Sequence, residues 1–127
     1  MKRDMELVRR ILFAIESEYK GVSICNLSVP EYDLVTIAEH CKIMYEKGLI
    51  NEYKPVQADG TPVLAFWVGN LTWEGYDFLD KIREDTVWNK TKGFIKDKAL
   101  PMTLDVIKEI ATAVISETLK GALAGML

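Results

Sequence analysis

The sequence predicts a mainly α fold with a small β-hairpin, an α+β architecture in which a winged helix-turn-helix is followed by C-terminal helices. Residues 31–47 carry apolar side chains at helical spacing and end in a Lys-Gly pair that stops a helix. Two strand-like segments follow, joined by a loop with Asp59-Gly60, a dipeptide that adopts the positive φ angles of a tight hairpin turn. A regular apolar pattern after Pro101 predicts one more helix. The helix and hairpin therefore read as a recognition helix and its wing.

We divide the chain accordingly into a winged-helix domain, residues 1–84, and a C-terminal helical extension, residues 85–127, which packs on that domain or forms an oligomer interface. A chain of 127 residues with 49% apolar and 28% charged side chains can build a compact core. Sixteen basic and nineteen acidic residues give a formal net charge of −3, which provides no overall field that attracts phosphates. This balance counts against generic nucleic-acid binding.

The first predicted helix covers residues 4–19, where apolar side chains recur every three or four positions and define one buried face. Asp4 is placed to cap its N-terminus, and Lys20-Gly21 ends it. The short segment Val22 to Leu27 is rich in branched residues, so we expect a small edge strand there.

The helix at residues 31–47 is predicted to follow Pro30, with Glu31 and Asp33 in its first turn, where carboxylates interact favourably with unpaired backbone N–H groups. Spacing residues by 100° separates a core stripe from an outer face that is mixed in charge. The core stripe contains Leu34, Ile37, Ala38, Cys41, Met44 and Tyr45. The outer face contains Tyr32, Thr36, Glu39, His40, Ile43, Glu46 and Lys47.

The predicted wing strands are Leu49 to Tyr53 and Val63 to Val68, with Pro62 at a position whose N–H the ladder does not need. Thr72 is a plausible N-cap for the next helix. That helix brings large apolar side chains expected to seal the domain, namely Trp73, Tyr76, Phe78, Leu79 and Ile82.

A further helix is predicted at residues 86–98, inside the one locally basic stretch. Between Lys81 and Lys98 there are six basic and three acidic residues. Trp88 and Phe94 lie within it at helical spacing, which is more typical of core residues than of aromatic side chains that stack on bases.

The last predicted helix opens at Thr103 and has the most regular apolar pattern in the chain. Its positions step by three and four, as in a helix-pairing seam, and predict a homo-oligomer. The alternative is a monomer that folds this helix back on itself. Charged residues in the same stretch exclude a conventional membrane span, so we expect no membrane association. The candidate oligomer interface is Leu104, Ile107, Ala111, Val114 and Thr118.

The sequence contains few residues at the spacings that catalysis or metal binding requires. His40 and Cys41 are neighbours about 100° apart on a helix and do not serve one site easily, so we expect no metal site. No glycine-rich phosphate-binding motif is present, and we expect neither a cofactor nor enzymatic activity. His40 is predicted to be exposed, and Cys25 and Cys41 to be small core residues. The two cysteines and the absence of a leader predict a cytoplasmic protein with free thiols.

Three stretches resemble a family of small bacterial and phage proteins classed as a domain of unknown function. They are residues 1–9, residues 46–50, and the run from Leu71 to Asp80 that continues through 85–90. More loosely, the Gly-Leu-Ile helix exit, the hairpin and the Leu-Thr-x-x-Gly helix start resemble winged-helix transcription regulators. Those regulators have a separate short helix before the recognition helix, for which only Val22 to Pro30 is available here. The resemblance implies a winged-helix-like N-terminal domain and no particular activity.

Two functions follow as expectations. The first is a non-enzymatic DNA-binding protein, like a transcription regulator of a phage or mobile element. It would present four residues of the 31–47 helix to a major groove of double-stranded DNA, with one wing residue near the backbone. The alternative is a protein-interaction module that docks on a host or phage protein, which Tyr32 and Ile43 suit better. The candidate DNA contacts are Thr36, His40, Ile43, Lys47 and Lys54.

Overall fold

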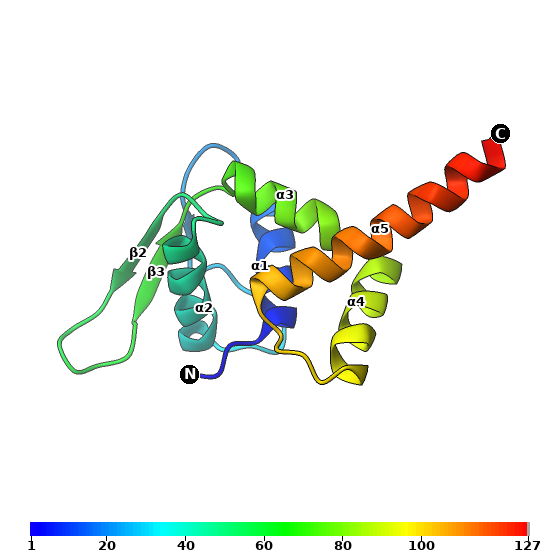
Figure 1. Cartoon of the computed structure of the whole chain (residues 1–127). Coiled ribbons are helices and arrows are strands. Elements are labelled where there is room, and N and C mark those ends of the chain that lie inside the picture. The colour runs from blue at the N-terminus through cyan, green and yellow to red at the C-terminus, as the bar shows by residue number, and fades with distance from the viewer. Residues whose placement is uncertain (127) are drawn as a thin grey trace. The chain divides into compact units, whose positions relative to one another are not determined.

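The computed structural model describes residues 1–126, which form five helices and three strands (Figure 1). This confirms the mainly helical α+β class. The residues group into two compact units, Met1–Asp77 and the chain from Phe78 onward, and α3 begins in the first and ends in the second. The predicted domain boundary after residue 84 stays a prediction. The elements are α1 Met5–Glu18, β1 Ile24–Cys25, α2 Leu34–Lys47, β2 Tyr53–Val56, β3 Ala65–Val68, α3 Trp73–Ile82, α4 Asp85–Asp97 and α5 Leu104–Met126.

Helix α1 begins at Met5, directly after its predicted N-cap residue Asp4. The Asp4 carboxylate accepts hydrogen bonds from the backbone N–H groups of Glu6 at 2.9 Å and Leu7 at 3.2 Å, which satisfies two donors that have no partner inside the helix. The predicted apolar stripe of α1 is buried, and α1 packs against α2. Ile11, Leu12 and Ile15 of the predicted stripe are fully buried, Tyr19 is half-buried, and Leu7, which was not predicted to belong to the stripe, is fully buried as well.

The three strands form one antiparallel sheet in the order β1-β3-β2. Strand β1 pairs Ile24 with Val68, so the predicted edge strand is confirmed. Strand β2 pairs Tyr53 with the same Val68 from the other side. Because β2 is an edge strand, Pro55 within it removes no ladder bond that a further strand would need.

The first wing strand was predicted too early. Leu49 and Ile50 are buried but lie outside β2, which starts at Tyr53. The Leu49 N–H donates to Met44 O at 2.9 Å, which closes the end of α2 after Gly48, and Ile50 makes an isolated bridge with Leu71. Their apolar character therefore reflects burial at a helix exit and not membership of the hairpin.

The start of α2 was also misplaced. The helix begins at Leu34, and Asp33 caps it by accepting the Thr36 N–H at 2.8 Å. Pro30 and Glu31 instead form a turn in which Glu31 has a left-handed φ of 78°. Between β1 and α2 no described residue is helical, so the segment contains no separate short helix.

Three exposure predictions for the first unit are wrong. His40 is fully buried, Tyr45 is 46% exposed, and Cys25 lies exposed on edge strand β1. The cause for α2 is that it contacts α1 as well as β2 and β3. A helix covered on two sides buries a wider arc than the apolar stripe alone indicates, and polar His40 falls inside it.

Helix α3 begins as predicted, because the Thr72 hydroxyl accepts the Gly75 N–H at 3.1 Å. Its aromatic residues do not all enter the core, since Trp73 is 79% exposed and Tyr76 also lies on the surface. Phe78, with Leu79 and Ile82, is fully buried. The aromatic seal expected of this helix is therefore limited to its second half.

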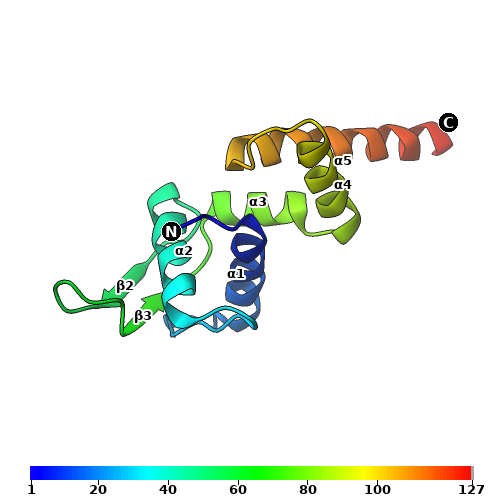
Figure 2. The ribbon, with the colours of Figure 1, turned by 90° about the horizontal axis from the view of Figure 1, so that it is seen from below.

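In the second unit α4 packs against α5. Trp88 is buried as predicted, whereas Phe94 is exposed and so is not a core residue. Helix α5 begins after Thr103, whose hydroxyl accepts the Val106 N–H at 3.2 Å, and its C-terminal turns extend beyond α4 in Figures 1 and 2. None of the helices within residues 1–126 has the length and apolar character that crossing a bilayer requires.

Candidate functional site

The five predicted DNA contacts do not share one exposed face. Lys47 and Lys54 are exposed, Thr36 and Ile43 are half-buried, and His40 is inaccessible. The Lys54 amine lies 3.6 Å from the Glu52 carboxylate, a surface ion pair that partly neutralises it. In this structure the His40 ring cannot reach a base edge.

His40 instead connects α2 to the start of α1. Its Nδ1 donates to Thr36 O at 2.8 Å, and its Nε2 accepts the Asp4 N–H at 2.9 Å. Only a neutral imidazole with the proton on Nδ1 satisfies both bonds. The ring is thus a structural link between two helices, which a sequence pattern could not reveal because Asp4 and His40 are 36 residues apart.

The carboxylate of Asp4 extends this link to the turn before α2. The Tyr32 hydroxyl donates to Asp4 Oδ2 at 2.8 Å. Burial, the largest single influence, raises the pKa of Asp4, but the bonds from Tyr32, Leu7 and Glu6 together outweigh it and leave the pKa below its usual value. The same bond to Asp4 is the main reason that the pKa of Tyr32 is raised. Tyr32, predicted to face a partner, is therefore occupied within the unit.

A groove of about 420 Å³ lies between α2 and the hairpin. The face of α2 that lines it follows helical spacing at Val35, Glu39 and Lys42, one position away from the predicted Thr36, His40 and Ile43. One residue corresponds to about 100° of rotation, so the two sets point in different directions. The hairpin side is lined by Tyr53, Pro55, Gln57, Thr61, Pro62 and Val63.

The walls of this groove mix apolar residues such as Val35 and Pro55 with polar ones, and they carry one charge of each sign, on Glu39 and Lys42. Burial first, and then the neighbouring Cys41 and Glu39, raise the pKa of Tyr53, so its hydroxyl remains protonated. Burial raises the pKa of Cys41 to about 12, which leaves its thiol without nucleophilic character at neutral pH. The groove is thus suited to contact with a partner surface more than to acid–base chemistry.

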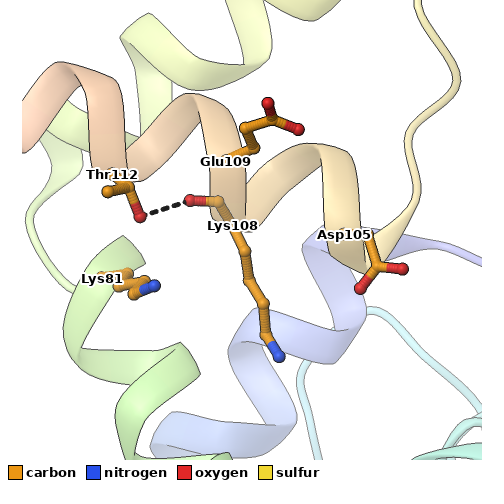
Figure 3. Close-up of a pocket in the computed structure, with 5 residues that line it drawn as sticks. All are labelled: Lys81, Asp105, Lys108, Glu109 and Thr112. Carbon is orange, nitrogen blue, oxygen red and sulfur yellow. Dashed lines mark hydrogen bonds between the residues drawn. The ribbon is translucent and has the colours of Figure 1, made fainter.

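A second hollow, of about 330 Å³, lies in the second unit between Lys81 of α3 and four residues of α5 (Figure 3). Two of these are acidic, Asp105 and Glu109, and Lys108 lies between them in sequence. The Thr112 hydroxyl donates to Lys108 O at 2.7 Å and is thus committed to its own helix. Because the hollow mixes both signs, it does not select one kind of ion. Across residues 1–126, no three His, Cys, Asp or Glu side chains are grouped as metal ligands.

The candidate oligomer seam on α5 divides into two parts. Leu104, Ile107 and Ala111 are buried within the single chain, Val114 is half-buried and Thr118 is exposed. Beyond Val114, exposed apolar residues follow at Ile115, Leu119, Leu123 and Met126. Ile115 and Leu119 each lie one residue after a predicted seam position, so this exposed row is rotated by about 100° from the predicted seam.

Comparison with known proteins identifies relatives without naming an activity. A family model described as hypothetical protein (DUF2513) matches residues 2–101, which covers every element before α5. A protein of Haemophilus influenzae (strain ATCC 51907 / DSM 11121 / KW20 / Rd), described as uncharacterized, is 38% identical over 121 residues, or 94% of this chain and 99% of that protein. No solved structure matches the chain. The chain belongs to the DUF2513 family of hypothetical proteins.

Proposed function

We propose that this protein is a non-enzymatic, winged-helix-like protein that binds double-stranded DNA in the manner of a transcription regulator. The observation that carries the proposal is the element order α1-β1-α2-β2-β3 combined with the sheet order β1-β3-β2. This arrangement places a 14-residue helix directly before a hairpin that is anchored to the same unit by β1. A helix of that length fits the major groove of B-form DNA.

The hairpin supports the proposal through its shape. The loop between β2 and β3 extends beyond the helices of the first unit in both views (Figures 1 and 2). Residues 57–62 within it are exposed, so the loop tip is available to contact a DNA backbone beside a helix in the groove. Gly60 at the tip has a φ of 73°, but Asp59 does not have the positive φ that a tight two-residue turn requires, so Asp59-Gly60 bends a longer loop between Val56 and Ala65.

Charge limits what this element can contribute. From α2 through β3 there are three basic residues, Lys42, Lys47 and Lys54, against four acidic ones, Glu39, Glu46, Glu52 and Asp59. Phosphate neutralisation supplies much of the affinity of DNA-binding proteins. Binding through α2 and the hairpin alone is therefore expected to be weak, and the proposal requires either base contacts or basic residues from another part of the chain.

A second function is favoured by the groove between α2 and the hairpin. A groove lined by both apolar and polar residues, with one glutamate and one lysine and hence no net charge, suits a peptide or protein surface better than a phosphate backbone. In that case the protein is an interaction module that docks on a host or phage protein. Neither proposal includes enzymatic activity. The environment of His40 supports this, because the ring is buried and each of its two nitrogens already has a hydrogen-bond partner.

The test is the binding of the full chain to duplex DNA, measured by fluorescence anisotropy between low and physiological salt. We expect association that weakens steeply with salt, and no binding at low salt would overturn the proposal. Replacing Glu39→Lys and Glu46→Lys should strengthen binding if α2 enters a groove. Glu18→Lys with Glu74→Lys, two exposed positions of the same unit, is the matched control. Equal gains in both variants would argue against a role for α2.

A further inference from the structure

We infer that the exposed face of α4 supplies the principal phosphate contacts when this protein binds duplex DNA. This inference rests on the proposed function and adds the surface that makes it electrostatically feasible. The surface, called the α4 lysine face below, consists of Lys90, Phe94, Lys96 and Lys98.

The α4 lysine face follows from how α4 packs. Its buried residues are Trp88, Thr91 and Ile95, which fall on one side of the helix at spacings of three and four. Lys90, Phe94 and the C-cap residue Lys98 recur every four residues on another side and are exposed. Lys96 is also exposed and lies about 120° around the helix from Lys90. The Lys98 amine lies 6.0 Å from the centre of the Phe94 ring, so an exposed aromatic ring supports one of the cations.

The charge of α4 differs in sign from that of the first unit. Helix α4 together with its C-cap residue Lys98 contains four lysines and two aspartates, a net charge of +2. Residues 1–77 contain eight basic and twelve acidic side chains, a net charge of −4. A polyanion approaching the protein is therefore attracted mainly by α4 and repelled on average by the first unit.

The lysines of this face are not committed to carboxylates inside the chain. Neither Lys90 nor Lys96 has an ion-pair partner within residues 1–126. By contrast, Arg83 of the same basic stretch is bonded to Asp80 at 2.8 Å. Interaction with the helix dipole explains a lysine in the last turn, such as Lys96, but not Lys90, which lies nearly two turns earlier. Unpaired cations grouped on one exposed helix are complementary to closely spaced phosphates.

An anionic membrane surface is the competing polyanion, and the composition of this face disfavours it. Helices that lie in a membrane interface bury a broad apolar side, whereas Phe94 is the single large apolar residue among these lysines. The other three residues of the α4 lysine face are lysines. Binding to a row of phosphates without insertion is the chemistry that this surface supports.

The experiment replaces Lys90, Lys96 and Lys98 with Glu in the full chain and measures binding to duplex DNA over a range of salt. The control replaces Lys2, Lys20 and Lys120 with Glu, because these exposed lysines give the same change in net charge elsewhere. We expect the α4 variant to bind at least about tenfold more weakly, and the slope of log affinity against log salt to become shallower by about two to three. The control should lose much less.

A Lys→Gln version of the α4 variant removes the charge without adding repulsion, and thermal unfolding followed by circular dichroism verifies that both variants fold. If the wild-type protein binds DNA and the α4 variants bind it equally well, this inference is overturned and the proposed function is left intact. The same conclusion follows if the control variant loses as much affinity as the α4 variants. A wild-type protein that does not bind DNA at low salt overturns both. Binding to phosphatidylserine vesicles in place of DNA would overturn the assignment of the phosphates to nucleic acid.

Discussion

Helices α2 and α4 have almost the same length, 14 and 13 residues, but the chain uses them differently. Helix α2 is covered by α1 and by the hairpin strands, and its one histidine is tied to the N-terminus of α1. Helix α4 buries one side and exposes its lysines. The helix that precedes the hairpin and the helix that exposes most of its lysines are therefore two different elements. Position comes from packing, whereas attraction comes from unpaired charge.

The largest effect that tests this difference is expected at two glycines. A Cβ at Gly75 would lie 2.1 Å from the backbone oxygen of Leu49, directly after the end of α2, while a Cβ at Gly93 in α4 meets nothing within 4 Å. Gly75→Ala should therefore lower the free energy of unfolding by about 3 kcal/mol or more. Gly93→Ala should raise it by up to about 1 kcal/mol, because alanine favours the helix.

Urea denaturation of the two alanine variants measures both effects. If Gly75→Ala were as stable as the wild-type protein, the close packing of α3 on the exit of α2 would not be rigid. A destabilised Gly93→Ala would show that the open side of α4 is covered in solution.

The second-largest effect is expected on the exposed C-terminal half of α5, in the second unit. Leu119 is 55% exposed and lies four residues from the exposed residues Ile115 and Leu123, so the three form an apolar row on the C-terminal half of α5. If that row pairs between two copies, Leu119→Glu should convert an oligomer into a monomer by placing a charge in the row. Static light scattering at high concentration measures the mass, with Lys120→Glu on the next position as control. A wild-type monomer would exclude the pairing role.

The smallest expected effect is a pH dependence specific to the first unit. Because the folded pKa of Asp4 lies below its ordinary value, its ionised form stabilises the fold. This contribution is complete above the unfolded pKa, near 3.8, and is lost as the pH falls through the folded value. The variant Asp4→Asn keeps an oxygen that can cap the helix but has no group that titrates. Between about pH 5 and pH 2, the free energy of unfolding of this variant, measured by urea titration, should therefore decline less than that of the wild-type protein. An identical decline would assign the effect to other carboxylates.

Caps and turns were predictable because they depend on neighbouring residues. Asp4 and Thr72 cap helices as predicted, and Gly48 ends α2 with a left-handed φ of 84°. Boundaries failed where an apolar residue was buried for a non-local reason, as at Leu49 and Ile50. The predicted contact residues of α2 stay a prediction, and the residues of α2 that line the groove lie one position away from Thr36, His40 and Ile43.

The sequence by itself determined the mainly α composition, the N-caps of α1 and α3, the end of α2 at Gly48 and the basic stretch from Lys81 to Lys98, because each depends on residue type or short spacing. Only the tertiary structure decided which sides of those elements are accessible. His40 became a buried link because α1 meets α2 across 36 residues of sequence, and Phe94 became exposed because α4 has a neighbour on one side alone. Accessibility depends on what packs where, and periodicity does not contain that information.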